Sequence, residues 1–249
     1  MLWIELIITG FIIGTLVISM GGGGAAIYLG VLTGVFHLPA AVAAATSLFT
    51  AFPSLCVGAY SHYRTGNVEA KVGNRMLLAA LPATIVGSLL SPFIPTKIYT
   101  WVIAIILVLL GVQIIARQYL PQRNKTANGG TKRIQAIAFG ILSGLMVGVA
   151  GLSGGGPILA GLLLMGLDTV HAAATSSYVL VGTTLIGLLF HMSSGHVDWS
   201  IGFGLMIGAI IGAALAPIII NRLNKRVLNL VLQPMMGLLL VIMGLRMIL

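Results

Sequence analysis

The sequence predicts an all-α polytopic membrane protein with two pseudo-symmetric repeats, and three observations support this class. The 249 residues include only 13 Lys and Arg and 4 Asp and Glu, while 58% are hydrophobic. A soluble domain has about 25% charged residues, so the soluble classes are excluded, and the apolar content excludes disorder. The apolar residues form runs that can cross a bilayer, and the two halves of the chain share a sequence pattern.

The apolar runs define the expected elements, because a spanning helix needs about 20 predominantly apolar residues. Two further apolar runs, 25–36 and 157–167, are shorter, and each follows a glycine cluster. Short, glycine-interrupted segments at corresponding places in two halves are typical of a transporter's binding site. We therefore expect about eight spanning helices plus two short broken or re-entrant helices. The eight expected spans are 2–20, 40–62, 73–91, 98–117, 134–152, 169–192, 199–220 and 227–248.

The internal repeat is visible when the chain is shifted by 129 positions. This shift gives 10 identities over the 32 positions 38–69, including a paired Thr-Ser, a His and a Gly-x-Val-acid pattern. Apolar composition alone would not match these polar residues, so the pattern indicates a true repeat. The polar segment PQRNKTANGGTKR separates the halves. We expect a first repeat over 1–118, a basic connector over 119–133 and a second repeat over 134–249.

The positions of the basic residues bear on the topology. If each short segment crosses, or forms a re-entrant pair with the helix before it, 11 Lys and Arg lie on one side and 2 on the other. If the short segments dip without changing side while the helix before them spans, the split is 9 to 4. The positive-inside rule favours the first arrangement, in which the repeats are inverted and both termini lie outside.

The glycine clusters are the first candidate site. Gly22, Gly23 and Gly24 align with Gly154, Gly155 and Gly156 at a shift of 132. Consecutive glycines within hydrocarbon expose backbone polar groups, which is tolerated only against protein or a water-filled cavity. The start of the helix that follows, with the glycine backbone, would form an anion cradle. Close packing between helices is the competing explanation.

Hydroxyl and imidazole side chains also recur in both halves. Thr46 and Ser47 align with Thr175 and Ser176, and a hydroxyl can donate to an anion without adding charge. The competing explanation is a hydrogen bond to a carbonyl of the same helix.

His62 aligns with His191 near the ends of two spans, where either an interfacial anchor or a group for proton coupling or gating fits. Glu69 and Asp198 each open the next span, as expected for acids that stabilise a helix dipole.

Several classes of function are excluded or disfavoured. The net charge of +9 is concentrated in the connector and at the ends of spans, so no nucleic-acid partner is expected. The single cysteine, Cys56, excludes an internal disulfide. No metal site and no cofactor are expected, and no motif of an ATP-driven pump is present. The absence of acids in mid-membrane favours an anionic or neutral substrate over a cation.

The order G-G-G, A-T-S and H-Y-R-T-G-N-V-E, repeated as G-G-G-P, A-A-T-S-S and H-M-S-S-G-H-V-D-W, resembles the TauE/SafE family of membrane permeases, the sulfite exporters. The resemblance covers essentially the whole chain. It implies transport of small sulfur-containing anions, such as sulfite or thiosulfate, and of other organic anions across the bacterial plasma membrane. Carried over by motif, it assigns substrate binding to the glycines and Thr/Ser pairs of both halves. The first half departs from the pattern, with Ala25 opposite Pro157.

We therefore expect a multi-pass transporter of the plasma (inner) membrane that moves a small anion by alternating access. The glycine loops and Thr/Ser pairs of both halves are expected to converge near the bilayer midplane, and one half to rock against the other. A passive anion channel is the alternative, with a membrane-embedded enzyme or assembly factor ranked below it. The expected partners are the anion and the lipid bilayer, and a homo-oligomer is left open.

Overall fold

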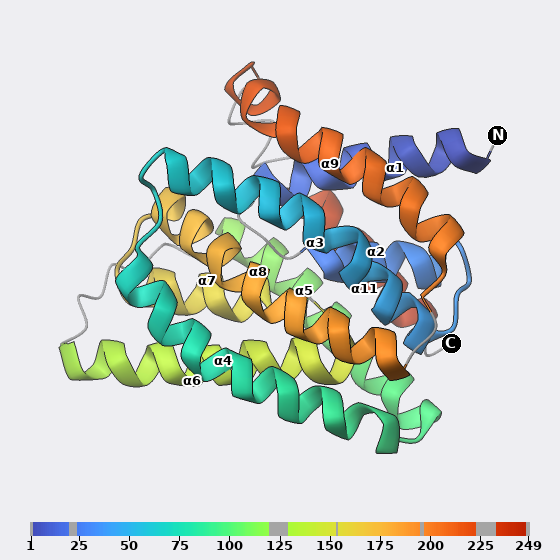
Figure 1. Cartoon of the computed structure of the whole chain (residues 1–249), viewed down its shortest axis with the longest axis horizontal. Helices are drawn as coiled ribbons and strands as arrows, with labels where there is room; N and C mark the ends of the chain where they lie inside the picture. Colours follow the sequence, from blue (N-terminus) through green and yellow to red (C-terminus); the bar gives the residue numbers. More distant parts are fainter. Residues whose placement is uncertain are drawn as a thin grey trace.

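A computed structural model gives the fold and describes residues 2–19, 24–119, 129–152, 154–194, 197–222 and 233–247. Within these ranges the chain forms ten α-helices and one short 3₁₀ turn, which confirms the all-α prediction (Figure 1). The elements are α1 (Leu2–Ser19), α2 (Gly24–Gly34), α3 (Ala40–Arg64), α4 (Ala70–Leu90), η1 (Ser91–Phe93), α5 (Thr96–Tyr119), α6 (Gly129–Ala150), α7 (Gly155–Leu164), α8 (Thr169–Ser194), α9 (Trp199–Arg222) and α11 (Gln233–Arg246).

Among the described residues, six helices are long and apolar enough to cross a membrane: α3, α4, α5, α6, α8 and α9. The sequence predicts eight, so the other two expected spans are not confirmed. Helix α1 has 18 residues, and its described apolar stretch, Trp3–Ile18, is shorter than the six spans. Gly24 at the start of α2 packs on Val17, and the Tyr28 hydroxyl donates to the Gly10 carbonyl at 3.3 Å. The remaining expected span, 227–248, is described only from residue 233 to 247.

A second helical hairpin joins α6 and α7. A β-carbon placed on Gly154 would collide with the Ser143 hydroxyl of α6, and one placed on Gly161 would lie 2.8 Å from Phe139. The residue numbers rise along α7 while those of the contacted residues fall along α6. Helix α7 therefore runs antiparallel to α6. The short segments expected at 25–36 and 157–167 are thus the second arms of two helical hairpins.

Glycines allow three pairs of helices to pack at backbone distance: the parallel pairs α1 with α9 and α4 with α6, and the antiparallel pair α5 with α11. On α1, Gly10 and Gly14 face the backbone of Leu205 and Ala209 on α9. Close approach of this kind is common where membrane helices carry small residues every fourth position. The residue numbers rise together along the two helices, so α1 and α9 are parallel.

The other closely packed parallel pair is α4 with α6. Gly140 and Gly144 of α6 face the backbone of Met76 and Ala80 of α4, again in parallel. In both pairs, one helix comes from residues before the connector and the other from residues after it. The two sequence halves are therefore interleaved in space and do not form separate bodies.

Helices α3 and α8 form the centre of the bundle. In each, 61% of the apolar stretch is buried, against 33–44% in the other four spanning helices. Gly187 of α8 packs beside Leu48 of α3, and the two helices run in opposite directions (Figure 1). Outer positions such as Leu78 and Leu189 are exposed, as expected for side chains that face lipid.

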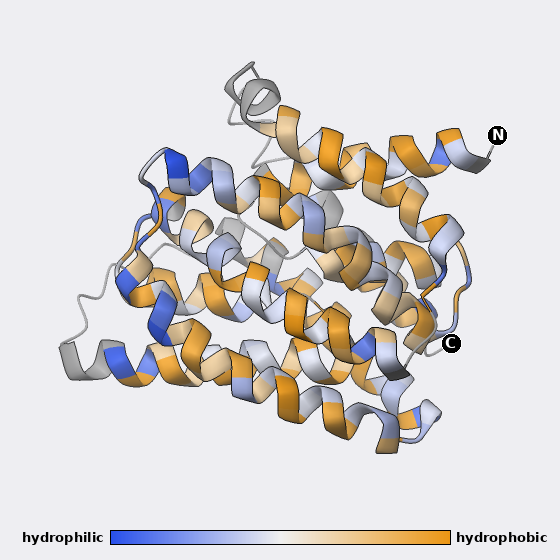
Figure 2. Ribbon diagram, in the orientation of Figure 1, coloured by the Kyte–Doolittle hydropathy of each residue, from blue (hydrophilic) through white to orange (hydrophobic). Residues whose placement is uncertain are grey.

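The two ends of the bundle differ in charge. Hydrophilic residues gather at the end where α3 finishes and where α4 and α6 begin (Figure 2). The described bases of these segments are Arg64, Lys71, Arg75 and Arg133. Both chain termini lie at the other end of the bundle (Figure 1).

Candidate functional site

Thr46 lies in the second turn of α3 and is fully buried. Its hydroxyl oxygen accepts a hydrogen bond from the backbone N–H of Asp198 at 3.0 Å. Its γ-methyl group lies 3.4 Å from where a β-carbon on Gly202 would be, so α9 approaches it closely. Thr46 therefore ties the start of α3 to the start of α9, 152 residues away in sequence.

Thr175 makes the corresponding contact at the other end of the central pair. It is fully buried in the second turn of α8, and its oxygen accepts a hydrogen bond from the backbone N–H of Glu69 at 2.9 Å. Its γ-methyl group lies 3.1 Å from the β-carbon position of Gly73 on α4. The aligned threonines of the two halves thus make reciprocal contacts across the molecule.

These bonds leave the threonine hydroxyl protons available. Each oxygen acts as the acceptor, and no acceptor for the proton of Thr46 or Thr175 is found among the residues that the structure describes. Most buried hydroxyl groups in helices instead donate to a carbonyl three or four residues back. Thr46 and Thr175 could therefore donate to a ligand while they hold α9 and α4 in place.

The neighbouring serines differ from each other. The Ser47 hydroxyl donates to the Ala44 carbonyl of its own helix at 2.8 Å, with the Gly151 carbonyl at 3.3 Å. The Ser176 hydroxyl is fully buried and has no hydrogen-bond partner within the described ranges. Ser47 therefore bonds a carbonyl of its own helix, which was the competing explanation for these hydroxyl residues. The Ser176 hydroxyl can bond a ligand or water.

The glycine cluster of the second half lies at the tip of the α6–α7 hairpin, and the first cluster is described only at Gly24. Gly22 and Gly23 fall outside the described residues, and Gly24 begins α2. In the second half, Gly154 immediately precedes α7, and Gly155 and Gly156 form its first turn.

Close contacts explain two positions near the second tip. Gly151 has a φ of +61°, and a β-carbon there would lie 2.5 Å from that of Ala44 on α3. Only glycine fits both requirements, the positive φ and the short distance to α3. Gly156 faces α5, where a β-carbon would lie 2.7 Å from Leu110.

The structure does not bring Thr46 and Thr175 together. Leu48 of α3 lies beside Gly187 of α8, and the helices are antiparallel. At 1.5 Å per residue, the two threonines are therefore about 20 Å apart along the helix axes. The expected convergence of both Thr/Ser pairs at one midplane point is wrong, because each pair lies near the start of its own helix and the two starts are at opposite ends of the bundle.

The two histidines also have different surroundings. His191 is buried, and its Nε2 lies 2.9 Å from the Gly148 carbonyl of α6, which links α8 to that helix. The Nε2 atom of His62 is buried without a partner in the part of the chain that is described. His191 therefore has a structural bond, while His62 keeps a nitrogen available for a proton or a ligand.

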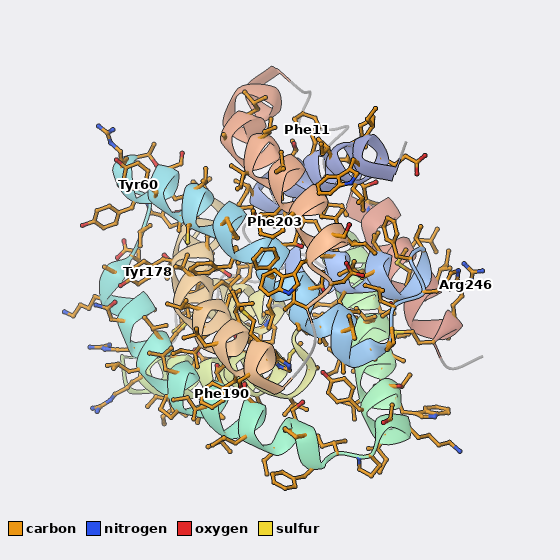
Figure 3. All side chains as sticks on the ribbon, turned by 45° about the vertical axis from the view of Figure 1, so that its right-hand side comes forward. Phe11, Tyr60, Tyr178, Phe190, Phe203 and Arg246 are labelled. Carbon is orange, nitrogen blue, oxygen red and sulfur yellow. The ribbon has the colours of Figure 1, made fainter. Side chains whose placement is uncertain are left out.

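The side chains next to the two threonines differ in polarity. Phe49, Trp199 and Phe203 form an aromatic cluster beside Thr46, with Phe49 5.2 Å from each of the other two ring centres in edge-on geometry. Beside Thr175, the Tyr178 hydroxyl donates to Asn74 at 2.7 Å instead. Figure 3 shows Tyr178 and Arg246 on opposite sides of the molecule, with Phe203 between them.

A cavity of about 360 Å³ opens at the end of the molecule where α2 and α11 finish. Its polar lining comes from Thr33, His37, Thr100 and Arg246, and it does not reach the candidate site residues. Within the described ranges, no three His, Cys, Asp or Glu side chains gather as metal ligands would. The fully or nearly buried polar side chains of the described residues are hydroxyl groups and the His191 imidazole.

Comparison with known proteins decides the family. The family model for "Sulfite exporter TauE/SafE" matches residues 6–247. The chain belongs to the TauE/SafE family. With six apolar spans among its described residues, it is a multi-pass membrane transporter of the plasma membrane.

Proteins similar to this TauE/SafE chain include named transporters and an enzyme. Two proteins of Bacillus subtilis (strain 168) are named probable membrane transporter proteins. YdhB is 30% identical over 228 residues, covering 90% of this chain and 93% of that protein, and YunE is 25% identical over 260 residues, covering 94% of each. An undecaprenyl-diphosphatase of Anaeromyxobacter dehalogenans (strain 2CP-C) is 31% identical over 165 residues, covering 64% of this chain and 54% of that protein. No solved structure matches the chain.

Two features of the TauE/SafE site were missed by the sequence analysis. The aromatic cluster of Phe49, Trp199 and Phe203 joins two helices, and no local pattern links its members. The reciprocal bonds to the N–H groups of Glu69 and Asp198 were also not expected. The Thr-Ser and Gly-x-Val-acid patterns contained the bonded residues, but the repeat alone did not indicate that they bond crosswise.

Proposed function

We propose that this TauE/SafE transporter moves small sulfur-containing or organic anions, such as sulfite, thiosulfate or sulfonates. The supporting observation is that the buried polar side chains of the described core are uncharged hydroxyls together with His191. A cation transporter needs carboxylates in the membrane. Hydroxyl groups donate hydrogen bonds to an oxyanion without a fixed counter-charge, so the anion can be released again.

The proposed binding groups are the hairpin tips and the paired hydroxyl residues. Thr46 and Thr175 are the strongest members, because each has a buried oxygen that is already bonded and a proton with no acceptor in the described part of the chain. Ser176 adds a buried hydroxyl without a described partner. The other members of the proposal are Ser47, Gly24, Gly154, Gly155 and Gly156, with Gly22 and Gly23 on sequence grounds.

We further infer two inverted repeats, 1–118 and 134–249, joined by the connector 119–133. The contacts described above support this inference in matching pairs. The parallel packing of α1 on α9 corresponds to that of α6 on α4, and the bond of Thr46 to Asp198 corresponds to that of Thr175 to Glu69. The exposed end that carries most of the bases would face the cytoplasm under the positive-inside rule.

Alternating access in this molecule would not move one sequence half against the other. The parallel helices that pack at backbone distance, α1 with α9 and α4 with α6, come from different halves. We propose that these two pairs move as units about the central pair α3 and α8. The threonine bonds lie where each unit meets the central pair, so anion binding there would couple to the movement.

The energy source proposed for export is the membrane potential. It favours exit of an anion from a negative interior by about 2.3 kcal/mol per charge per 100 mV. Proton coupling would add to this if His62, with its unbonded nitrogen, exchanges a proton during the cycle.

The test replaces both threonines by valine, which keeps the γ-methyl groups that face Gly73 and Gly202 and removes only the hydroxyls. A hydrogen bond to an ionised group contributes about 1.5–3 kcal/mol, so uptake of radiolabelled sulfite or thiosulfate into proteoliposomes should fall about tenfold or more. Membrane insertion should be unchanged.

The control is the double change of Thr46 and Thr175 to serine, which keeps the hydroxyls and should keep most of the uptake. Normal uptake in the valine variant would show that these residues do not bind the substrate.

A further inference from the structure

Ser143 and Thr184 are exceptions among the buried hydroxyl residues. The hydroxyls of Ser54 and Thr84 donate to carbonyls of their own helices at 2.8 Å, which is the usual arrangement. Ser143 on α6 and Thr184 on α8 are both fully buried, and neither hydroxyl has a partner among the described residues. An unsatisfied buried hydroxyl costs about 1–3 kcal/mol, so its retention needs an explanation such as a ligand.

Ser143 points at the start of α7. A β-carbon added to Gly154 would overlap the Ser143 hydroxyl oxygen, and Gly154 is the residue that immediately precedes α7. The first turn of a helix carries partial positive charge from its aligned peptide dipoles, so it attracts anions. The hydroxyl of Ser143 therefore lies where a bound anion would meet the positive end of α7.

Thr184 lies at the same level on the neighbouring helix. A β-carbon added to Gly187 of α8 would lie 2.7 Å from Val147 of α6. Farther along both helices, the His191 ring contacts the Gly148 carbonyl. The two helices are thus parallel in this region. One turn back from the first contact, on the same faces, are Thr184 and Ser143.

The position of this pair in the bundle is central. Thr184 is close to the midpoint of α8, which spans Thr169–Ser194. Helix α7 packs against both α6 and α8, and Gly154 at its start lies against Ser143. Two buried hydroxyl donors and a helix N-terminus therefore lie at the same level of three helices that pack on one another.

We propose that Ser143, Thr184 and the first turn of α7 form a binding site for the oxygen atoms of a compact oxyanion. The inference rests on the proposed function and gives it a second, central location. Sulfite, thiosulfate and small sulfonates carry two or three equivalent acceptor oxygens, which two hydroxyl donors and a helix N-terminus can bond together. The site lacks a fixed cation in its described part, which favours rapid release.

The corresponding place in the first half is apolar. Gly10 of α1 contacts Leu205 of α9 in the same way as Gly140 of α6 contacts Met76 of α4. When these two contacts are aligned, Ile13 of α1 takes the position that Ser143 has in α6. The alignment of Thr46 with Thr175 puts Leu55 opposite Thr184. Ile13 and Leu55 are both buried. The central site is therefore present once per chain, although the threonine contacts occur twice.

The experiment compares the double change Ser143→Ala with Thr184→Val against Ser54→Ala in full-length protein in proteoliposomes. Ser54 is equally buried, but its hydroxyl is bonded within α3, so its loss should leave transport unchanged. The double variant should raise the half-saturating concentration of thiosulfate about tenfold or more. An unchanged value in the double variant overturns the central site while the proposed function stands.

A second measurement covers the case in which the double variant does not fold. In a Cys56→Ala background, which removes the single native cysteine, Ser143→Cys is labelled with N-ethylmaleimide. Thiosulfate or methanesulfonate should slow this labelling, and chloride at equal ionic strength should not. Labelling that no oxyanion slows overturns the central site. A wild-type protein that transports none of these anions overturns the proposed function as well.

Discussion

Thr46 and Thr175 differ from the other buried hydroxyl residues in what they bond. Ser47 and Ser54 donate to carbonyls of their own helix, so they need nothing from outside it. The two threonines accept from backbone N–H groups at the starts of α9 and α4. A single side chain can thus hold a neighbouring helix and still offer its proton to a substrate.

Asp168, outside the spans, provides a residue-level prediction about pH. Its carboxylate caps α8 by accepting from the N–H groups of Val170 and His171 at 2.9 and 3.1 Å. The His171 backbone bond, followed by a bond from the His171 ring, lowers the pKa of this carboxyl below its ordinary 3.8. The folded state is therefore stabilised above that ordinary value, and the stabilisation is lost as the pH falls through the lowered pKa. Asp168→Ala should lower the Tm in detergent at neutral pH.

The same variant should differ less from the wild type in acid below pH 3.8, as the pH falls through the lowered pKa and the wild-type carboxylate is protonated. Asp168→Asn is the matched control, because asparagine also caps helices and lacks the charge. Its Tm should lie between those of the wild type and the alanine variant at neutral pH. A Tm difference between wild type and alanine variant that grows on acidification would contradict the cap.

At the scale of elements, the parallel pairs depend on glycine. Gly144 of α6 faces the Ala80 carbonyl of α4 so closely that a β-carbon cannot be accommodated without movement of the backbone. Gly144→Ala should therefore destabilise the protein by about 1–3 kcal/mol, the usual cost of overpacking. The measurement is the thermal midpoint of aggregation in detergent, followed by size-exclusion chromatography.

Gly30→Ala is the matched control for this prediction. A β-carbon there would lie 3.0 Å from the sulfur of Met243, a flexible side chain that can move aside. Alanine also favours the helix over glycine. Equal thermal midpoints for the two variants would show that the α4–α6 contact does not depend on the missing β-carbon.

Much of the element structure was predictable from the sequence, and the pairing of elements was not. Length and apolarity located the helices, and the glycine clusters located the short helices that begin at Gly24 and Gly155. Helices that are apolar on all sides have no polar face to show which neighbour they contact. The packing of α2 back along α1 therefore depends on tertiary contacts such as Tyr28 with Gly10.

The candidate site follows the same division. The aligned residues Thr46 and Thr175 were found because the repeat preserves them, and the same repeat suggested that they converge. Their separation by about 20 Å follows from the antiparallel packing of α3 and α8, which the alignment does not contain. Ser143 could not be predicted from the repeat, because the aligned residue in the first half is Ile13.

At the scale of the whole molecule, symmetry and asymmetry have separate consequences. The pairs α1 with α9 and α4 with α6 each join a helix from one half of the chain to a helix from the other half. The aromatic cluster around Phe49 and the Tyr178–Asn74 bond give the two ends different chemistry. A substrate that enters at one end therefore meets different groups when it leaves at the other.

Counterflow of radiolabelled anion in proteoliposomes tests the central claim, that this TauE/SafE chain is a carrier of small oxyanions, most directly. Vesicles that contain the wild-type protein are loaded with unlabelled sulfite, thiosulfate or methanesulfonate, and labelled anion is added outside. A carrier with alternating access predicts that internal anion speeds the uptake of label and that the label transiently accumulates. Uptake that is indifferent to internal anion would contradict the account and indicate a passive channel, and no uptake of any of the three would contradict the proposed substrate class.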